Sequence, residues 1–463
     1  MSEGVTTAGS RAVRIISVAP FFSTEWPSGV FAFGNAAAAD LTLAHVRVEV
    51  EDRAGRTAEG WGAIFLDHAW AFPGDDLSDE AKDQIMRAII GMAGNRLIAD
   101  GDYGHPLDHF LAIEPQLGEI AIGRGGGGTI DVPLLAALVA CSPLDAAIHD
   151  AYGKLHGVSS YDALGPDFVA WDLGRVLGER FAGRYLPDFL RSQPVDFLPI
   201  MHAVGMSDPL TPAEQGTSAY HCLTDWIAID GVHCFKVELR GKDLAWDIAR
   251  LVDVYTTASE SVGLAGEVRI FADLDEQGSS PEYVRSLLDG VETRSAAAFA
   301  ALDAIQQPVR RDPGAGAADF RDVSSRVPVV LDEGLTSLAA IDHAVALGWN
   351  GIVLETGKTQ SLVLLALAKA SELGLHVSVQ DLTNPGIALL QSVGLAARLP
   401  RIMPVENNQR QYFPATSKPE ERVFPWIFAV RDGGVPANEL TGPGLGYGDL
   451  ARIDRDIFSA PPV

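Results

Sequence analysis

Hydrophobic and polar residues alternate along the first part of the chain. In "HVRVEVEDRAGRTAEGWGAIF", which begins at residue 45, Val46, Val48 and Val50 alternate with charged residues before the turn "DRAGR". Strict alternation is typical of a β-strand with one buried and one solvated face. Residues 12–70 are therefore predicted to form an antiparallel meander.

The spacing of apolar residues becomes helical over residues 78–100 and 131–157. In "SPLDAAIHDAYGKLHG", Ser142 is predicted to cap a helix, Pro143 to occupy its first position and Gly157 to end it. The first 160 residues therefore combine strands and helices.

Beyond residue 195, short apolar runs alternate with helical stretches at intervals of roughly 23 to 36 residues, which is about the length of one βα unit. Several runs are apolar on both faces, as the strands of a parallel sheet are. Eight such units close into a barrel, so an α/β fold is predicted. The runs are "FLPIMHAV", "HCFKVEL", "VRIFADL", "AAFAALDAIQQ", "VPVVLDE", "GIVLETG", "HVSVQDL" and "RIMPVEN".

Polar and charged residues follow the ends of these runs, where the chemistry of such barrels is located. Like charges aimed into one cavity repel each other and lose solvation, so this cluster requires a cation or a substrate. Its members are His202, Lys236, Glu238, Asp273, Asp275, Gln306, Asp332, Glu333, Glu355, Lys358, Gln380, Asp381 and Glu406.

Composition narrows the classes of partner. A chain of 463 residues exceeds what one hydrophobic core usually organises, so two domains are expected. The 61 acidic and 35 basic residues give a net charge of −26, which repels phosphate backbones and anionic lipids and argues against nucleic acid and membrane partners. Three cysteines without CxxC spacing, no signal peptide and no segment of roughly 20 apolar residues predict a cytoplasmic protein.

Three stretches carry a family resemblance: "SPLDAAIHDAYGKLHGVSSYDALG", "VVLDEGLTSLAAID" and "PGLGYGD" near residue 443. They resemble the Asp- and Lys-containing helix before the barrel, the fifth-strand Asp-Glu motif and the closing segment of the enolase superfamily, in its mandelate racemase and muconate lactonizing branch. The similarity runs from about residue 12 to 450. It implies a modified TIM-type (β/α)7β barrel with an N-terminal α+β capping domain, assembled as a homo-oligomer.

The resemblance also implies a metal site. Members of the family hold Mg²⁺ with carboxylates at the ends of barrel strands three, four and five, and the ion makes the proton beside a substrate carboxylate removable. These positions fall on Asp273, Gln306 and Asp332. Because Gln306 offers a neutral carbonyl oxygen instead of a carboxylate, weaker Mg²⁺ binding is expected. Solvated acids that hold no metal are the alternative.

The family's Lys-x-Lys motif at the second strand is replaced by "KVE", with Lys236 at the first lysine and Glu238 at the second. Glu355 stands across the barrel, and Asp381, which ends the seventh strand, is a further candidate for a catalytic acid or base. Buried carboxylates among negative charges can act as bases, so Glu238 and Glu355 are predicted to face a small-molecule carboxylate substrate from opposite sides, with Lys236 holding its carboxylate. A structural ion pair between Lys236 and Glu238 is the alternative.

Four further residues are candidates for the site. His202 is a third possible acid or base, although an isolated histidine is more often simply hydrogen-bonded. Lys358 is a candidate for substrate binding. In the family, an early loop covers the barrel mouth, and "FFSTEWPSGVFAF" (21–33) occupies that place, which makes Trp26 and Phe31 substrate-binding candidates. Packing of that stretch within its own domain is the alternative.

The predicted domains are a capping domain (1–160), a connecting helical insertion (161–194), a catalytic barrel (195–424) and a C-terminal segment that returns to the capping domain (425–463). The expected function is Mg²⁺-assisted removal of a proton beside a carboxylate, as in a dehydratase, racemase, epimerase or cycloisomerase. A barrel that has lost catalysis and serves as a binding or scaffold protein is the main alternative. A different, metal-free reaction ranks last, because no nucleophile motif such as GxSxG is present.

Overall fold

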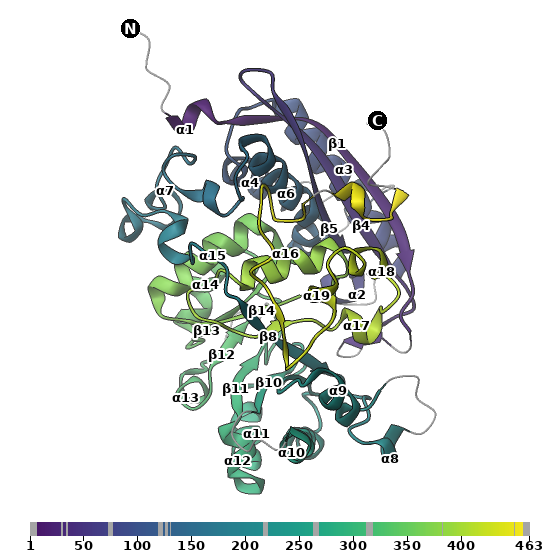
Figure 1. The fold of residues 1–463 in the computed structure, drawn as a ribbon. Coiled ribbons are helices and arrows are strands. Elements are labelled where there is room, and N and C mark those ends of the chain that lie inside the picture. Colours follow the sequence, from purple (N-terminus) through teal and green to yellow (C-terminus); the bar gives the residue numbers. More distant parts are fainter. Residues whose placement is uncertain are drawn as a thin grey trace.

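The computed structural model of the chain contains an N-terminal capping domain and a barrel, with the C-terminal segment crossing between them (Figure 1). The structure describes residues 7–28, 31–33, 36–72, 77–118, 124–125, 128–129, 131–215, 221–262, 268–311, 318–381, 383–448 and 450–456.

The capping domain is built on an antiparallel sheet in the order β1-β4-β5, which confirms the predicted meander. Val46, Val48 and Val50 are fully buried on one face, as their alternation predicts. Arg47, on the other face, is also buried, so that face is less solvated than predicted. The strands are β1 (Val13–Glu25), β4 (Leu41–Asp52) and β5 (Thr57–Phe65).

Helix α6 (Leu134–His156) corrects the prediction that a helix begins at Pro143, because it runs through that proline without interruption. A proline inside a helix leaves the carbonyl four residues earlier without its N–H donor. Here the hydroxyl of Ser142 donates to that carbonyl, of Val139, at 2.9 Å. Ser142 thus supports the helix from within and does not cap it. Gly157 ends the helix in a left-handed conformation, as predicted.

Two glycines allow α6 to lie directly against β5. A Cβ added at Gly60 would lie 2.2 Å from the carbonyl oxygen of Ala147, and one at Gly62 would lie 2.2 Å from that of Pro143.

By length and composition α6 could cross a membrane, which corrects the expectation that no segment approaches that length. Its apolar window is 94% buried within the protein, and core helices pass the same test.

The remaining elements before the barrel are mostly short. The helices are α1 (Thr7–Ser10), α2 (His68–Ala71), α3 (Asp79–Asp100), α4 (Pro106–Ile113), α7 (Gly174–Leu177) and the 3-10 turns η1 (Glu114–Gln116), η2 (Asp162–Leu164), η3 (Glu179–Phe181) and η4 (Leu186–Phe189); the strands are β2 (Phe31–Phe33), β3 (Ala36–Ala38), β6 (Arg124–Gly125) and β7 (Gly128–Thr129).

The barrel closes, which confirms the predicted fold class. Consecutive strands pair in parallel, and the last pairs with the first through Val405 and Ile200. The strands are β8 (Phe197–Val204), β9 (Cys234–Glu238), β10 (Arg269–Asp273), β11 (Leu302–Gln306), β12 (Val329–Leu331), β13 (Gly351–Glu355), β14 (His376–Gln380) and β15 (Val405–Glu406).

Helices surround this barrel in Figure 1. Those between its strands are α8 (Pro212–Gln215), α9 (Leu223–Asp230), α10 (Leu244–Val262), α11 (Pro281–Arg294), α12 (Ala296–Ala300), α13 (Arg321–Ser324), α14 (Leu338–Ala346), α15 (Gln360–Leu373), α16 (Ile387–Ala396) and the 3-10 turn η5 (Thr356–Lys358). After the last barrel strand follow α17 (Gln409–Tyr412), α18 (Lys418–Glu421), α19 (Pro425–Phe428) and the 3-10 turn η6 (Leu450–Arg452). A separate apolar cluster comes from the barrel strands and the segment before β15: Met201, Phe271, Ala304, Val330, Val353 and Met403.

The C-terminal segment contacts both parts of the molecule. Strand β16 (Gly434–Pro436) pairs antiparallel with β8 of the barrel. Further along, the amide of Leu445 donates to the carboxylate of Asp150 in α6, at 3.0 Å. This segment therefore joins the barrel to the capping domain.

Candidate active site

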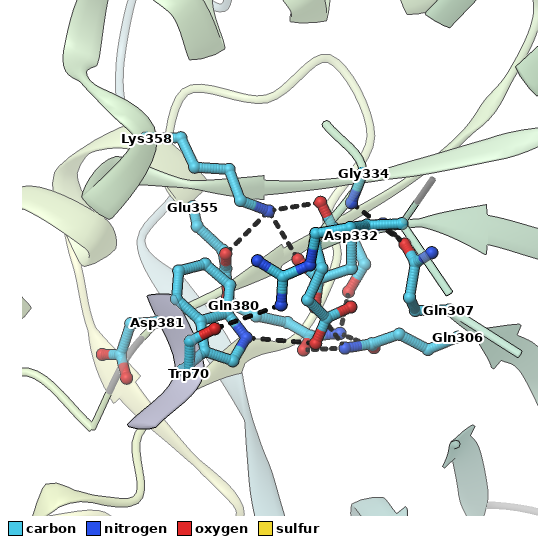
Figure 2. A network of polar contacts seen from close by, with 12 residues as sticks. Trp70, Gln306, Gln307, Asp332, Gly334, Glu355, Lys358, Gln380 and Asp381 are labelled. Carbon is cyan, nitrogen blue, oxygen red and sulfur yellow. Dashed lines mark hydrogen bonds and ion pairs between the residues drawn. The ribbon is translucent and has the colours of Figure 1, made fainter. Parts of the chain in front are cut away.

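The structure brings most of the polar strand-end residues together at one end of the barrel (Figure 2). Parallel strands all end on the same side, so side chains from strands far apart in sequence meet there. These side chains are buried, and none is more than 6% exposed. We call this set the mouth network: Lys236, Asp273, Gln306, Asp332, Glu355, Lys358, Gln380 and Glu406.

Lys358 lies at one side of the mouth network. Its Nζ donates to Asp332 Oδ1 at 2.6 Å and to the Asp332 carbonyl at 2.7 Å, and lies 2.8 Å from Glu355 Oε2. Burial alone would lower the pKa of Lys358, but the charges of Asp332 and Glu355 raise it. The ammonium group is therefore positively charged. Thr359, which follows, has φ of +78°, a strained conformation of the kind found at functional sites.

Gln306 lies between the two predicted carboxylate ligands. Its Nε2 is 2.8 Å from Asp273 Oδ2 and 2.6 Å from Asp332 Oδ2. Its Oε1 accepts a hydrogen bond from Gln380 Nε2, and Figure 2 shows these two amides facing each other. The N–H side of the Gln306 amide faces the carboxylates because an amide oxygen there would be repelled by both.

Lys236 reaches across the barrel from β9. Its Nζ lies 3.1 Å from Glu406 Oε1, 3.4 Å from Gln380 Oε1 and 3.6 Å from Asp273 Oδ2. Burial alone would lower its pKa, but the charges of Glu406 and Asp273 raise it well above the ordinary value. The two lysines thus lie on either side of the amide bridge made by Gln306.

Glu238 and Glu355 end strands β9 and β13, which are four strands apart in either direction around the closed barrel and therefore opposite each other. Burial raises the pKa of each carboxyl to about 8, helped by the charge of Asp273 at Glu238 and of Asp332 at Glu355. Among the described residues, Oε2 of Glu238 has no hydrogen-bond partner. Both groups can hold or release a proton near neutral pH.

Asp381 lies at the edge of the mouth network in Figure 2. One of its oxygens accepts the amide of Thr383 at 2.9 Å, and the other has no hydrogen-bond partner in the described part of the chain. Burial, and then the charge of Glu406, raises the pKa of Asp381 well above the ordinary value. Its predicted role as an acid or base stays a prediction.

His202 belongs to a different cluster. Its Nδ1 lies 3.3 Å from the guanidinium of Arg410, which pairs with Asp230 at 3.1 Å, and its ring packs against that of Trp226 at an angle of 52°. Burial, and then the charge of Arg410, lowers the pKa of His202 well below the ordinary value, so the ring is neutral. No hydrogen bond or ion pair joins His202 to the mouth network among the described residues.

The predicted covering loop is only partly described. Trp26 is 69% exposed, and the amide of Ser28 donates to the carbonyl of Tyr412, 2.8 Å away, just beyond β15. The side chain of Phe31 lies outside the described residues. Substrate binding by Trp26 and Phe31 stays a prediction.

Trp70, from α2 of the capping domain, is a site residue that the sequence did not reveal. Its Nε1 donates to Glu333 Oε1 at 3.0 Å, and its ring lies 5.3 Å from the ammonium of Lys358. Its carbonyl accepts from Arg311 at 3.1 Å. The motif "DHAWAF" gives no periodic signal that would place this indole in the barrel mouth.

Gln307 was also missed. It has φ of +29°, and its Oε1 accepts the amides of Asp332 at 2.9 Å and Gly334 at 3.2 Å. Figure 2 shows this side chain directed at the loop after β12, while Gln306 enters the mouth network. Gln307 therefore positions Asp332 through the backbone.

Comparison with known proteins supports the same family as the sequence motifs. Residues 221–448, just under half of the chain, match the family described as enolase C-terminal domain-like. A search of the curated proteins finds no match.

Solved structures match over nearly the whole chain. A muconate lactonizing enzyme from Pseudomonas fluorescens, complexed with muconolactone, is 16% identical, with a TM-score of 0.61, 96% of this chain covered and 100% of the other. A mandelate racemase/muconate lactonizing enzyme from Bordetella bronchiseptica RB50 is 20% identical (TM-score 0.60; 96% and 99% covered). An enolase superfamily member from Roseovarius nubinhibens ISM, complexed with magnesium, is 19% identical (TM-score 0.61; 96% and 98% covered).

At these identities the likeness shows the fold. Together with the family match, it confirms the resemblance to the mandelate racemase and muconate lactonizing branch of the enolase superfamily.

The three predicted metal ligands lie together, but the donors they present do not fit Mg²⁺. The ion requires oxygen donors in near-octahedral geometry, whereas Gln306 presents an N–H group to Asp273 and Asp332. The amide oxygen expected to bind the metal is bonded to Gln380 instead. Across the described ranges, no three His, Cys, Asp or Glu side chains form a group that could hold a metal ion.

Proposed function

We propose that this chain is an enzyme that removes the proton beside the carboxylate of a small organic acid and returns it, as a racemase or epimerase does. The observation that carries the proposal is the opposed placement of Glu238 and Glu355, each with a pKa of about 8. A substrate held between them would present one face of the reacting carbon to each. One carboxylate would take the proton while the other, still protonated, supplies one.

The two lysines provide the positive charge that such a reaction needs. Removing a proton beside a carboxylate places negative charge on the carboxylate oxygens, and a preorganised cation in a dry site lowers the energy of that state. Lys236 and Lys358 are both buried and charged, and they lie on the sides of the mouth from which Glu238 and Glu355 project. The ring of Trp70 lies 5.3 Å from the ammonium of Lys358 and would help to keep water from that side of the site.

The names of similar structures agree with this reaction type, since they include a mandelate racemase/muconate lactonizing enzyme. Two opposed acid-base groups favour a racemase or epimerase over a dehydratase or cycloisomerase, because proton return on the opposite face requires the second group. The proposed substrate class is a small carboxylic acid with a hydrogen on the adjacent carbon.

The test is hydrogen exchange at carbon. Panels of small carboxylic acids, including 2-hydroxy acids, N-acyl amino acids and sugar acids, are incubated with the protein in D2O, and loss of the proton signal beside the carboxylate is followed by NMR. We expect exchange with at least one class. Glu238→Gln and Glu355→Gln should each slow interconversion of the two enantiomers by about 10² to 10⁴, because inversion needs both groups.

Glu282→Gln, an exposed change at the start of α11, is the matched control and should leave the exchange rate unchanged. Interconversion of the two enantiomers that continues at the wild-type rate in both Glu238→Gln and Glu355→Gln would refute the roles given to these residues. No exchange across the panel, with one acid nevertheless binding in the mouth, would support the binding-protein alternative.

A further inference from the structure

Along the mouth network, groups that donate hydrogen bonds alternate with carboxylates that accept them. From one side of the barrel to the other, the order is Lys236, Asp273, Gln306, Asp332 and Lys358, and each neighbouring pair lies within 3.6 Å. Each aspartate therefore lies between one ammonium group and the shared amide. Both oxygens of Asp273 accept hydrogen bonds, from Gln306 and from the amide of Asp275.

The positive charge in this row equals that of one divalent ion. Asp273 and Asp332 carry a formal charge of −2, and Lys236 and Lys358 together carry +2. A divalent cation between the aspartates would face the Gln306 N–H group and two ammonium groups, all of which repel it. In a family that holds its ion with three carboxylates, replacing one by glutamine also removes a negative charge from the ion's binding site.

If the oxygen and nitrogen of the Gln306 side-chain amide exchanged places, the oxygen could face a metal ion, but hydrogen bonds would be lost. The carbonyl oxygen would then face Asp273 and Asp332, but its present bond from Gln380 would be broken. The amide nitrogen would face the Gln380 amide nitrogen, so two donors would oppose each other. Turning both amides together would set the N–H group of Gln380 against the ammonium of Lys236, which now donates to Gln380 Oε1 at 3.4 Å. The surroundings of Gln306 therefore favour the orientation that excludes a cation.

We propose that this barrel works without a divalent metal ion, with Lys236 and Lys358 as its built-in cations and Gln306 as the residue that excludes the ion and bridges Asp273 and Asp332. The absence of metal binding is independent of any reaction, whereas the part the lysines play in catalysis rests on the proposed function. The remaining carboxyls of the reaction, Glu238 and Glu355, can be neutralised by protons.

The test is calorimetric titration of the full chain with MgCl2, after dialysis against EDTA and then against metal-free buffer. The wild-type protein should give no binding heat at millimolar Mg²⁺. Gln306→Glu restores a third carboxylate, and its affinity for Mg²⁺ should exceed that of the wild type by at least about tenfold. Gln307→Glu, one residue away but directed at the 332–334 loop, is the matched control and should not gain binding.

One Mg²⁺ bound per wild-type chain, with binding lost in Asp273→Asn, would overturn the proposal. Gln306→Glu that folds, by near-ultraviolet circular dichroism, yet binds no better than Gln307→Glu would overturn the part given to Gln306. If Gln306→Glu does not fold, the wild-type titration and metal content by mass spectrometry still decide the main claim.

Carbon-hydrogen exchange separates this inference from the proposed function. Exchange that is unaffected by EDTA supports both. Exchange abolished by EDTA and recovered with Mg²⁺ overturns the inference and leaves the proposed function in place. Absence of exchange, together with absence of Mg²⁺ binding, overturns the proposed function alone.

Discussion

Lys358 is fully buried and is held by three oxygen atoms from Asp332 and Glu355. Removing one partner of a buried ion pair leaves an uncompensated charge, which costs far more than the pair itself contributes. Asp332 and Glu355 therefore depend on Lys358 for folding, and the charge of Lys358 lowers the pKa of Glu355 against the effect of burial.

Lys358→Met should lower the free energy of unfolding by about 3 kcal/mol. The ammonium group disappears while Asp332 and Glu355 stay buried. Urea unfolding followed by fluorescence measures the change. Lys369→Met, which breaks the more exposed pair with Asp342, is the matched control and should cost less than about 1 kcal/mol. Equal losses in the two variants would contradict a special role for Lys358.

The pKa values of about 8 at Glu238 and Glu355 predict a bell-shaped pH profile for kcat/KM of racemisation or epimerisation. Below pH 8 both carboxyls are protonated and no base is available; above pH 8 both are ionised and no acid is available. The rate should peak near pH 8 and fall about tenfold per pH unit on each side. A profile that keeps rising to pH 10 would rule out a carboxyl as the acid.

At the level of residues, the sequence predicted where the side chains would lie better than which way their polar groups would point. The order of the strands predicted that Asp273, Gln306 and Asp332 would meet, because parallel strands end together. It could not show that the N–H side of Gln306 would face the two aspartates, since that depends on Gln380, which lies 74 residues away. The sequence could not reveal Trp70 as a site residue for a similar reason, because the residues that it contacts belong to another domain.

At the level of elements, α6 shows how packing overrides a local signal. Pro143 indicated a helix start, but Ser142 compensates for its missing N–H, and the helix continues along β5. The glycines Gly60 and Gly62 are what allow this contact, because the helix backbone occupies the space that a side chain would need. The sequence showed the alternation of apolar and charged residues in β4, but it did not show against which strand α6 would pack.

Gly62→Ala should lower the free energy of unfolding by about 3 kcal/mol, because the new Cβ would lie 2.2 Å from the carbonyl oxygen of Pro143. Chemical unfolding followed by circular dichroism measures it. Gly91→Ala, in α3, has nothing within 4 Å of the added Cβ and should raise stability by about 1 kcal/mol. A neutral Gly62→Ala would show that α6 can move away from the sheet.

At the level of the whole molecule, Trp70 connects the capping domain to the barrel through both its indole and its backbone. The indole donates to Glu333, and the carbonyl accepts from Arg311, which is itself paired with Glu276 at 2.7 Å. A residue of the capping domain is therefore held against residues at the mouth of the barrel.

Trp70→Phe keeps an aromatic ring but removes the donor to Glu333, so a buried carboxylate oxygen loses its partner. Hydrogen exchange of the 329–355 segment, followed by mass spectrometry, should become about tenfold faster as the mouth opens more often. The same measurement over β1 and β4 provides the internal control and should not change. Equal acceleration in both regions would indicate general destabilisation instead.

The burial of the mouth network also bears on the speed of turnover. Every reacting side chain is no more than 6% exposed, and Trp70 lies against Lys358, so we expect substrate entry and product release to require displacement of Trp70. Domain displacement through solvent is slowed by friction, whereas proton transfer inside a closed cavity is not. Turnover limited by these movements would decline as glycerol or sucrose thickens the medium, and a substrate deuterated at the reacting carbon would then be processed as fast as an ordinary one.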